Sequence, residues 1–255
     1  MWQTPYDTQG AHYLAPVVAD GSVFVGGGYN GGLYSFDAVT GAVNWHADLP
    51  QYGLWSPTWW RGNILVDTNE LDVFDATSGA KEIAIGEFDG GYVDNQATLY
   101  IPPFAYVMKY DQLIAYDLST RAIAWTYAVH TVGDLSAEMA TDGSELFVVN
   151  NGTLTSIEAT TGRLLWSWRA SPSVSVNSNV IVTLSHVIVS TPTNTYMINR
   201  DTHLVDKMLP VGGNILAFGE GELIVGSQLN GIVWAFGVSE EATSGCSGVV
   251  CPPVR

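Results

Sequence analysis

Six copies of one short pattern recur along the 255-residue chain. Each copy begins with an apolar stretch that ends at an acidic residue or its equivalent, and most continue through small residues to a glycine and then an aromatic residue. The acidic position and its equivalents fall at residues 37, 75, 117, 158, 199 and 237, so the copies are spaced by 38, 42, 41, 41 and 38 residues. A fixed period of this length predicts one supersecondary unit repeated along the chain. The copies are Leu33–Trp45, Leu71–Ile83, Leu113–Trp125 and Leu154–Trp166, a degraded copy at Thr195–Lys207, and a shortened copy at Ile232–Gly237.

Each unit contains four short strand-like stretches separated by turn residues. In the first unit, Asp20-Gly21 separates two apolar stretches, and Asn30-Gly31-Gly32 precedes the third. Asp-Gly and Asn-Gly are typical of tight hairpins because these residues tolerate positive φ. Four antiparallel strands per unit predict an all-β, six-bladed β-propeller. We expect a single domain with blades at about 12–46, 54–86, 92–128, 135–169, 174–210 and 213–237.

The Asp-x-x-x-Gly-x-x-x-Trp pattern has a structural explanation. The carboxylate can accept hydrogen bonds from the backbone amides of the turn that follows it. Glycine can adopt the left-handed conformation that reverses the chain, and the indole can lie over a neighbouring unit and donate its N–H to a carbonyl. These residues are therefore interpreted as turn and packing elements.

The pattern resembles the tryptophan-docking motif of the PQQ-like, quinoprotein-type propeller family, and the resemblance extends over nearly the whole chain. Trp45, Trp125 and Trp166 match the docking tryptophan, whereas Ile83 and Lys207 depart from it. The resemblance implies that blades two and five are held more loosely. Trp2 fits the last position of the motif.

Two closures of the propeller ring remain open. Residues 1–6, which carry Trp2, could supply the outer strand of the last blade. Alternatively, residues 250–255 could do so, because the Gly/Ser-rich tail 238–255 resembles the disulfide-tied hairpin of some secreted family members. In that second case Cys246 and Cys251 form a disulfide.

The resemblance also raises the question of PQQ chemistry. Quinoprotein dehydrogenases imply PQQ with calcium in the central channel, an adjacent cysteine pair and a catalytic Asp. This sequence has no Cys-Cys pair, and its two cysteines lie in the tail. It also lacks His-x-His, His-x-x-x-His and Gly-x-Ser-x-Gly. We therefore expect no PQQ, no other cofactor and no metal, and we expect a propeller that is not an enzyme.

The loops that lead into the innermost strand of each blade converge on the hub of a propeller. Aromatic and polar side chains there can bind a small polar or cationic ligand or a sugar, or they can simply fill the channel. The predicted ligand-binding residues are Trp55, Tyr92, Asp134 and Asn214. If the protein is instead a lyase- or hydrolase-type enzyme without a cofactor, the predicted acid and base residues are His12, Tyr13, Asp94 and Glu138.

Two further segments invite interpretation. Strand alternation places Trp55 and Trp59 on one face of the second blade and Trp60 on the other, where they either fill the core between blades or form an exposed stacking surface. In the third unit, residues 102–110 are interpreted as a loop that departs from the shared blade and carries partner binding.

Charge and cysteine content limit the partners. Nine Lys and Arg against 25 Asp and Glu give a net charge of −16, so nucleic acid and anionic membranes are excluded as first hypotheses. No apolar run is long enough to span a membrane.

A non-catalytic scaffold that binds a protein or a small polar ligand fits best, as a monomer or as part of a longer chain. The paired tail cysteines favour a secreted or periplasmic protein whose leader is absent from this sequence.

Overall fold

A computed structural model describes residues 1–7, 15–28, 31–49, 53–68, 70–86, 93–94, 98–109, 111–130 and 139–237. Within this part of the chain every regular element is a β-strand. The strands divide between two compact units. Unit 1 contains residues 1–129 and 160–162, and unit 2 contains residues 130–159 and 163–255.

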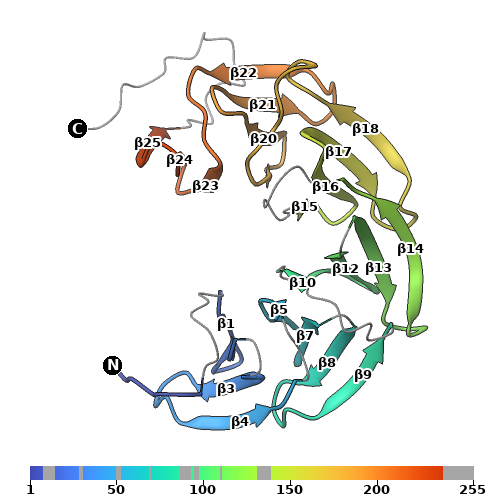
Figure 1. The fold of residues 1–255 in the computed structure, drawn as a ribbon, viewed down its shortest axis with the longest axis vertical. Coiled ribbons are helices and arrows are strands. Elements are labelled where there is room, and N and C mark those ends of the chain that lie inside the picture. Colours follow the sequence, from blue (N-terminus) through green and yellow to red (C-terminus); the bar gives the residue numbers. More distant parts are fainter. Residues whose placement is uncertain are drawn as a thin grey trace. The chain divides into compact units, whose positions relative to one another are not determined.

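Unit 1 holds three four-stranded antiparallel sheets, which we number blades 1 to 3 (Figure 1). In each blade the strands follow one another in chain order, so each pairs with the next. Blade 1 consists of β1 (Val17–Ala19), β2 (Ser22–Gly26), β3 (Leu33–Asp37) and β4 (Val43–Ala47). Blade 2 consists of β6 (Thr58–Trp60), β7 (Asn63–Asp67), β8 (Leu71–Asp75) and β9 (Lys81–Ile85). Blade 3 consists of β11 (Leu99–Ile101), β12 (Phe104–Lys109), β13 (Gln112–Asp117) and β14 (Ala122–Ala128). A separate parallel pair joins β5 (Gly53–Leu54) to β10 (Val93–Asp94).

Unit 2 holds blades 4 to 6, which follow the same order of strands. Blade 4 consists of β15 (Met139–Thr141), β16 (Glu145–Asn150), β17 (Thr153–Glu158) and β18 (Leu164–Trp168). Blade 5 consists of β19 (Ile181–Val182), β20 (His186–Ser190), β21 (Thr195–Asn199) and β22 (Val205–Leu209). Blade 6 consists of β23 (Ile215–Gly219), β24 (Glu222–Ser227) and β25 (Ile232–Gly237), and its sheet has three strands within the described residues.

The hairpin turns follow the sequence prediction. Asp20 and Gly21 have φ of 47° and 74°, and Asn151 and Gly152 have φ of 48° and 69°. Two successive positive φ angles define the turn that matches the twist of antiparallel strands. The same geometry occurs at Arg61-Gly62, where the sequence gives only a glycine as a signal.

The third strands of blades 1 to 5 contribute much of the core. Each of them runs between two neighbours in its own sheet, and burial is nearly continuous in β3, β8, β13 and β17. In five blades the third and fourth strands pair with a shift in register near the end of the third strand. In blade 1 the shift lies between Ser35 and Phe36, just before the turn residue Asp37, and the other four blades have it at the equivalent place. The blades thus repeat even this irregularity in the hydrogen-bond ladder between their third and fourth strands.

One sequence interpretation was wrong. Residues 102–109 do not form a departing loop, because Pro102 and Pro103 form a two-residue turn between β11 and β12. Residues 104–109 then pair along their whole length with β13. Because two prolines stand where other units have Asp-Gly, the sequence did not signal the hairpin that joins these two strands of the blade.

Candidate functional site

The structure brings together two of the predicted hub loops, both in unit 1. β5 and β10 pair in parallel, with Gly53 opposite Val93 and Leu54 opposite Asp94. The loops that lead into blades 2 and 3 are therefore joined through their backbones. The backbone of Asp94 thereby lies beside the residue that precedes Trp55.

Trp55 is a core residue of unit 1. Its side chain is 2% exposed and packs in a cluster with Phe24, Leu33 and Trp59. Its indole Nε1 finds no acceptor among the described residues. Trp60 belongs to a different cluster, where its ring centroid lies 4.4 Å from that of Tyr100. The predicted division of the three tryptophans between two faces is confirmed, and both faces are packed in the core.

Asn214, in unit 2, lies just before β23 and is bonded to the opposite hairpin. Its Nδ2 donates to Gln228 Oε1 at 2.8 Å, and its Oδ1 accepts from the Gln228 amide at 3.0 Å. Its own amide donates to the Gly226 carbonyl at 3.0 Å. The side chain thus fixes the end of the β24–β25 hairpin, and its binding role stays a prediction.

The remaining candidates lie outside the described part of the chain or are described only in part. For Asp94 the structure gives the backbone alone. The predicted residues outside the described ranges are His12, Tyr13, Tyr92, Asp134, Glu138, Cys246 and Cys251.

The acidic residues of the repeat cap turns, as the sequence predicts. Asp37 Oδ1 accepts hydrogen bonds from the amides of Val39 at 3.0 Å and Thr40 at 2.7 Å. The Thr40 amide, followed by its hydroxyl, lowers the pKa of Asp37. Asp75, Asp117 and Asn199 make the same pair of amide contacts in their own turns.

The docking indoles also lie as predicted. Trp45 Nε1 donates to the Ala76 carbonyl at 2.9 Å, and the ring covers Gly79 so closely that a Cβ there would lie 2.6 Å from it. Trp125 covers Gly162 in the same way. In unit 2, Trp166 stacks on His203, with centroids 4.5 Å apart. An aromatic ring thus replaces glycine as the docking surface at that turn.

Sequence reasoning missed a buried carboxylate in blade 2. The Asp72 side chain is 1% exposed, and Lys81 Nζ lies 2.7 Å from its Oδ1 and 2.8 Å from Glu70 Oε1. Burial raises the pKa of Asp72 to about 6 despite this ammonium group. Burial lowers the pKa of Lys81, but the hydrogen bonds that its ammonium group donates to these two carboxylates outweigh this effect, so the pKa is raised. A charged residue inside the apolar third strand Leu71-Asp72-Val73 was the available signal.

A Ser–His–Asp chain occurs on blade 5. Ser185 Oγ lies 2.8 Å from His186 Nδ1, and His186 Nε2 lies 3.0 Å from Asp206 Oδ2. This order of groups can activate a serine, but the Asp206 side chain is 46% exposed and Ser185 is exposed. Water therefore competes for each bond, and the dry, preorganised surroundings of an acyl-transfer site are missing.

The described residues contain no group of three His, Cys, Asp or Glu side chains that could hold a metal ion. They also contain no helix long and apolar enough to cross a membrane.

Comparison with known proteins decides the family. A family model described as outer membrane protein assembly factor BamB matches residues 1–82 and 88–214. The chain belongs to this PQQ-type repeat family. Its fold is therefore the six-bladed β-propeller type predicted from the repeat, and the family resemblance is confirmed.

Solved structures support the same fold for this PQQ-type propeller. BamB from Moraxella catarrhalis is 15% identical, with a TM-score of 0.71 over 88% of this chain and 69% of that one. The quinohemoprotein alcohol dehydrogenase ADHIIG from Pseudomonas putida HK5 is also 15% identical, with a TM-score of 0.66 over 97% of this chain. The chain spans 48% of that dehydrogenase. No curated protein matches the sequence.

The residues of this PQQ-type propeller do not fit the quinone site that the dehydrogenases imply. The sequence has two cysteines, and they are separated by four residues instead of being adjacent. The part of the chain that the structure describes offers no carboxylate cluster for a calcium ion.

Proposed function

We propose that this propeller is a non-catalytic scaffold that binds a protein partner, or a small polar ligand, through its hub loops. The observation that carries the proposal is the backbone pairing of β5 with β10, directly before the buried Trp55 in the chain. Such pairing fixes the backbones of these two segments relative to each other, which reduces the entropy lost when a partner binds beside them.

The family description supports a protein partner. The matching model is named for an assembly factor of outer membrane proteins. We propose that the partner of this chain belongs to the same process, and that Tyr92, Asp134 and Asn214 face it. Aromatic and carboxylate groups together suit a partner with exposed Lys or Arg side chains.

We propose a periplasmic or secreted location, in which Cys246 and Cys251 form a disulfide. Disulfides persist in oxidising compartments and are rare in the cytosol. Thiol titration of the denatured protein after export to the periplasm should find no free thiol. Two free thiols would contradict the disulfide.

Binding is the test of the scaffold. The probe is an unfolded outer membrane β-barrel polypeptide held in dilute urea, with the propeller immobilised. We expect saturable binding that Tyr92→Ala with Asp134→Ala weakens at least about tenfold, which corresponds to about 1.4 kcal/mol. The matched control is Asp48→Ala, because this carboxylate is fully open to solvent.

The enzyme alternative makes the opposite prediction. If His12, Tyr13, Asp94 and Glu138 supply an acid and a base, purified protein should turn over an ester, glycoside or uronide substrate. Turnover that Glu138→Gln abolishes would overturn the scaffold proposal, as would the absence of saturable binding. The Ser185–His186–Asp206 chain provides an internal check, since Ser185→Ala should leave the background hydrolysis of p-nitrophenyl acetate unchanged.

A further inference from the structure

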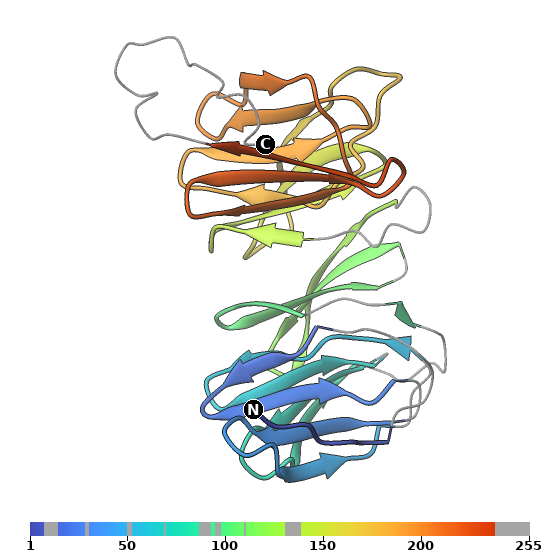
Figure 2. The same cartoon turned by 90° about the vertical axis from the view of Figure 1, so that its left-hand side faces the viewer.

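An aromatic pair lies at the contact between blades 4 and 5 of unit 2. The ring centroids of Trp168, on β18, and Tyr196, on β21, are 4.9 Å apart, and the ring planes are inclined at 57°. Figures 1 and 2 draw these strands in yellow and orange. Both side chains are partly exposed and pack against the core that the two blades share. Since rings at this angle are not stacked, each leaves part of its face to a third group.

The pair is not part of the docking contact. Trp166, two residues before Trp168, is the docking residue of this blade and stacks on His203. In unit 1 the two contacts between successive blades have no aromatic residue at the positions of Trp168 and Tyr196. The residues there are Ala47 and Asp72 in one contact, and Ile85 and Ile114 in the other. The fold therefore does not require aromatic rings at these positions, and their presence in unit 2 indicates another role.

Hydrogen-bond donors border the two rings. Asn194 Nδ2 donates to the Tyr196 hydroxyl and to Thr193 Oγ1, each at 3.3 Å. The Tyr196 hydroxyl accepts this bond and so keeps its own proton to donate. Trp168 Nε1 has no acceptor among the described residues and is not one of their buried unpaired atoms, so it is open to water. The indole N–H and the phenol O–H can therefore both donate to a bound molecule.

The chain around the pair carries little charge. Residues 170–199 contain no Asp, Glu, Lys or Arg, although the whole chain has 25 acidic and nine basic residues. Met208 lies opposite Tyr196 in β22, so it shares a face of the sheet with that ring, and it is 52% exposed. These side chains form an apolar surface with uncharged donors, which we call the aromatic patch. It consists of Trp168, Thr193, Asn194, Tyr196 and Met208.

A proline-rich segment in the polyproline II conformation presents the complementary groups. Its rings are apolar, its carbonyls are acceptors, and each proline lacks the backbone N–H that would need an acceptor. Protein domains that recognise such segments use surfaces lined by aromatic side chains. The segment is also preordered, so little chain entropy is lost on binding.

We propose that the aromatic patch binds an uncharged, proline-rich segment of a partner protein. Proline rings pack against Trp168 and Tyr196, and the carbonyls of the segment accept hydrogen bonds from the Trp168 indole and the Tyr196 hydroxyl. The inference goes beyond the proposed function, since none of the patch residues is among the predicted hub residues.

A decaproline peptide tests the proposal, because it adopts the polyproline II conformation in water. With the full chain immobilised, we expect saturable binding with a Kd on the order of 0.1 mM. Trp168→Ala should weaken this binding at least about tenfold, since it removes both an aromatic surface and a donor. A Gly-Ser peptide of the same length is flexible and has no proline rings, so it should not bind saturably.

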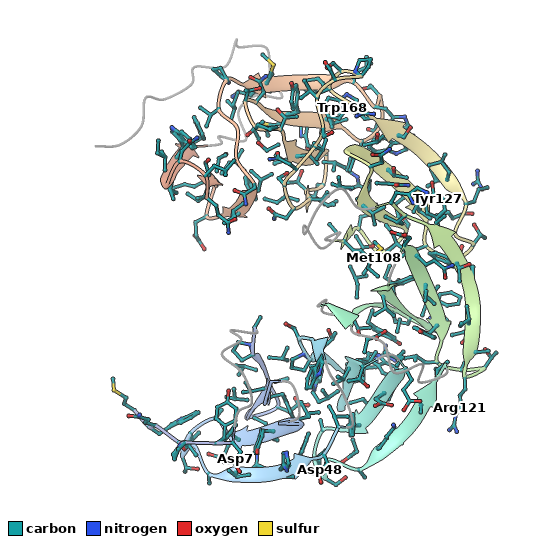
Figure 3. All side chains as sticks on the ribbon, viewed as in Figure 1. Asp7, Asp48, Met108, Arg121, Tyr127 and Trp168 are labelled. Carbon is teal, nitrogen blue, oxygen red and sulfur yellow. The ribbon has the colours of Figure 1, made fainter. Side chains whose placement is uncertain are left out.

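Two further variants separate recognition from loss of structure. Tyr127 occupies the position of Trp168 in blade 3 and is also partly exposed, so Tyr127→Ala is the matched control and should leave decaproline binding unchanged (Figure 3). Tyr196→Phe keeps the ring and removes only the hydroxyl. It should weaken binding by about three- to tenfold, the loss of one hydrogen bond, while urea unfolding stays cooperative.

Four results would overturn the proposal. Decaproline does not bind saturably, the Gly-Ser peptide binds as tightly, or Tyr127→Ala weakens binding as much as Trp168→Ala does. The fourth concerns a neutral glycan, the other class of ligand that aromatic rings and uncharged donors accommodate. If chitotriose binds in place of decaproline and Trp168→Ala abolishes that binding, the patch is a sugar site.

Discussion

At the scale of the residue, the Asp72 carboxylate lies in an environment very different from water. A carboxylate buried among apolar strands is disfavoured in its charged form, and one ammonium group only partly offsets this. Its neighbours on β8, Leu71 and Val73, are buried, and its partner on β7, Val66, is buried as well. Asp72 therefore stays protonated in the folded protein at pH values where it is ionised in the unfolded chain.

This linkage predicts a pH dependence with a definite sign. Between about pH 4 and pH 6 the folded state binds a proton at Asp72 that the unfolded state has released, so this group's contribution to stability falls as pH rises. The shift from 3.8 to about 6 corresponds to roughly 2–3 kcal/mol. We expect Asp72→Asn to gain stability relative to the unmodified protein as pH rises from 4 to 7, measured by urea unfolding. A constant difference between the two proteins across this range would contradict the prediction.

Arg121 offers a second prediction at this scale. It occupies the glycine position of its turn with φ of 57°, a conformation that costs a non-glycine residue about 1 kcal/mol. Figure 3 shows its side chain projecting away from the strands, so little packing is lost on removal. Arg121→Gly should therefore raise the free energy of unfolding by up to about 1 kcal/mol.

His203→Gly is the informative comparison for Arg121→Gly. His203 has nearly the same φ, 58°, but stacks on Trp166. Loss of that stacking removes about 0.5–1.5 kcal/mol, so the gain should vanish or change sign. Equal gains at both positions would show that the stacking contributes nothing.

At the scale of the element, the indole and the turn it covers act together. The sequence predicted this arrangement well because one local motif contains the capping Asp, the reversing Gly and the docking Trp. It predicted less well where a residue substitutes for a motif member, as at His203 and Pro102-Pro103. The physical requirement there is a positive φ or a two-residue reversal, which several residue types can meet.

Two glycines with nearly the same φ allow the cost of backbone strain to be distinguished from the cost of a steric clash with the indole. Gly79 has φ of 72° and lies under Trp45, whereas Gly21 has φ of 74° and a Cβ added there would meet nothing within 4 Å. We expect Gly21→Ala to destabilise by about 1 kcal/mol through backbone strain alone. Gly79→Ala should lose a further 1–3 kcal/mol, roughly, because the indole must move. Equal losses in urea unfolding would rule out the docking contact as a source of stability.

At the scale of the whole molecule, the period of the repeat and its four strands per unit predicted the fold class, and the resemblance of its Asp–Gly–Trp pattern to the tryptophan-docking motif predicted the family. The hub could not be predicted equally well, since the sequence does not reveal whether a side chain in a connecting loop faces a ligand or a neighbour. Trp55 and Asn214 illustrate this limit: one is packed in the core, and the other fixes a hairpin. Both positions were selected because they carry an aromatic or polar side chain in a loop that leads into an innermost strand.

The net charge of −16 is also a property of the whole molecule. Like charges destabilise a compact state, and salt screens their repulsion. Raising NaCl from 10 to 300 mM at pH 7 should stabilise the protein by about 1 kcal/mol, or about 2–4 °C in Tm. The effect should diminish at pH 4, where many carboxylates are neutral, and a Tm that falls with salt at pH 7 would contradict it.

The docking of Trp45 on Gly79 also has an evolutionary consequence. Because the copies Leu33–Trp45 and Leu154–Trp166 each carry both a receiving glycine and a docking tryptophan, duplicating either copy in frame supplies a new donor and a new acceptor at once. Loss of either copy likewise removes one of each. Recombination can therefore change the number of repeats in such a protein without requiring a new kind of docking contact.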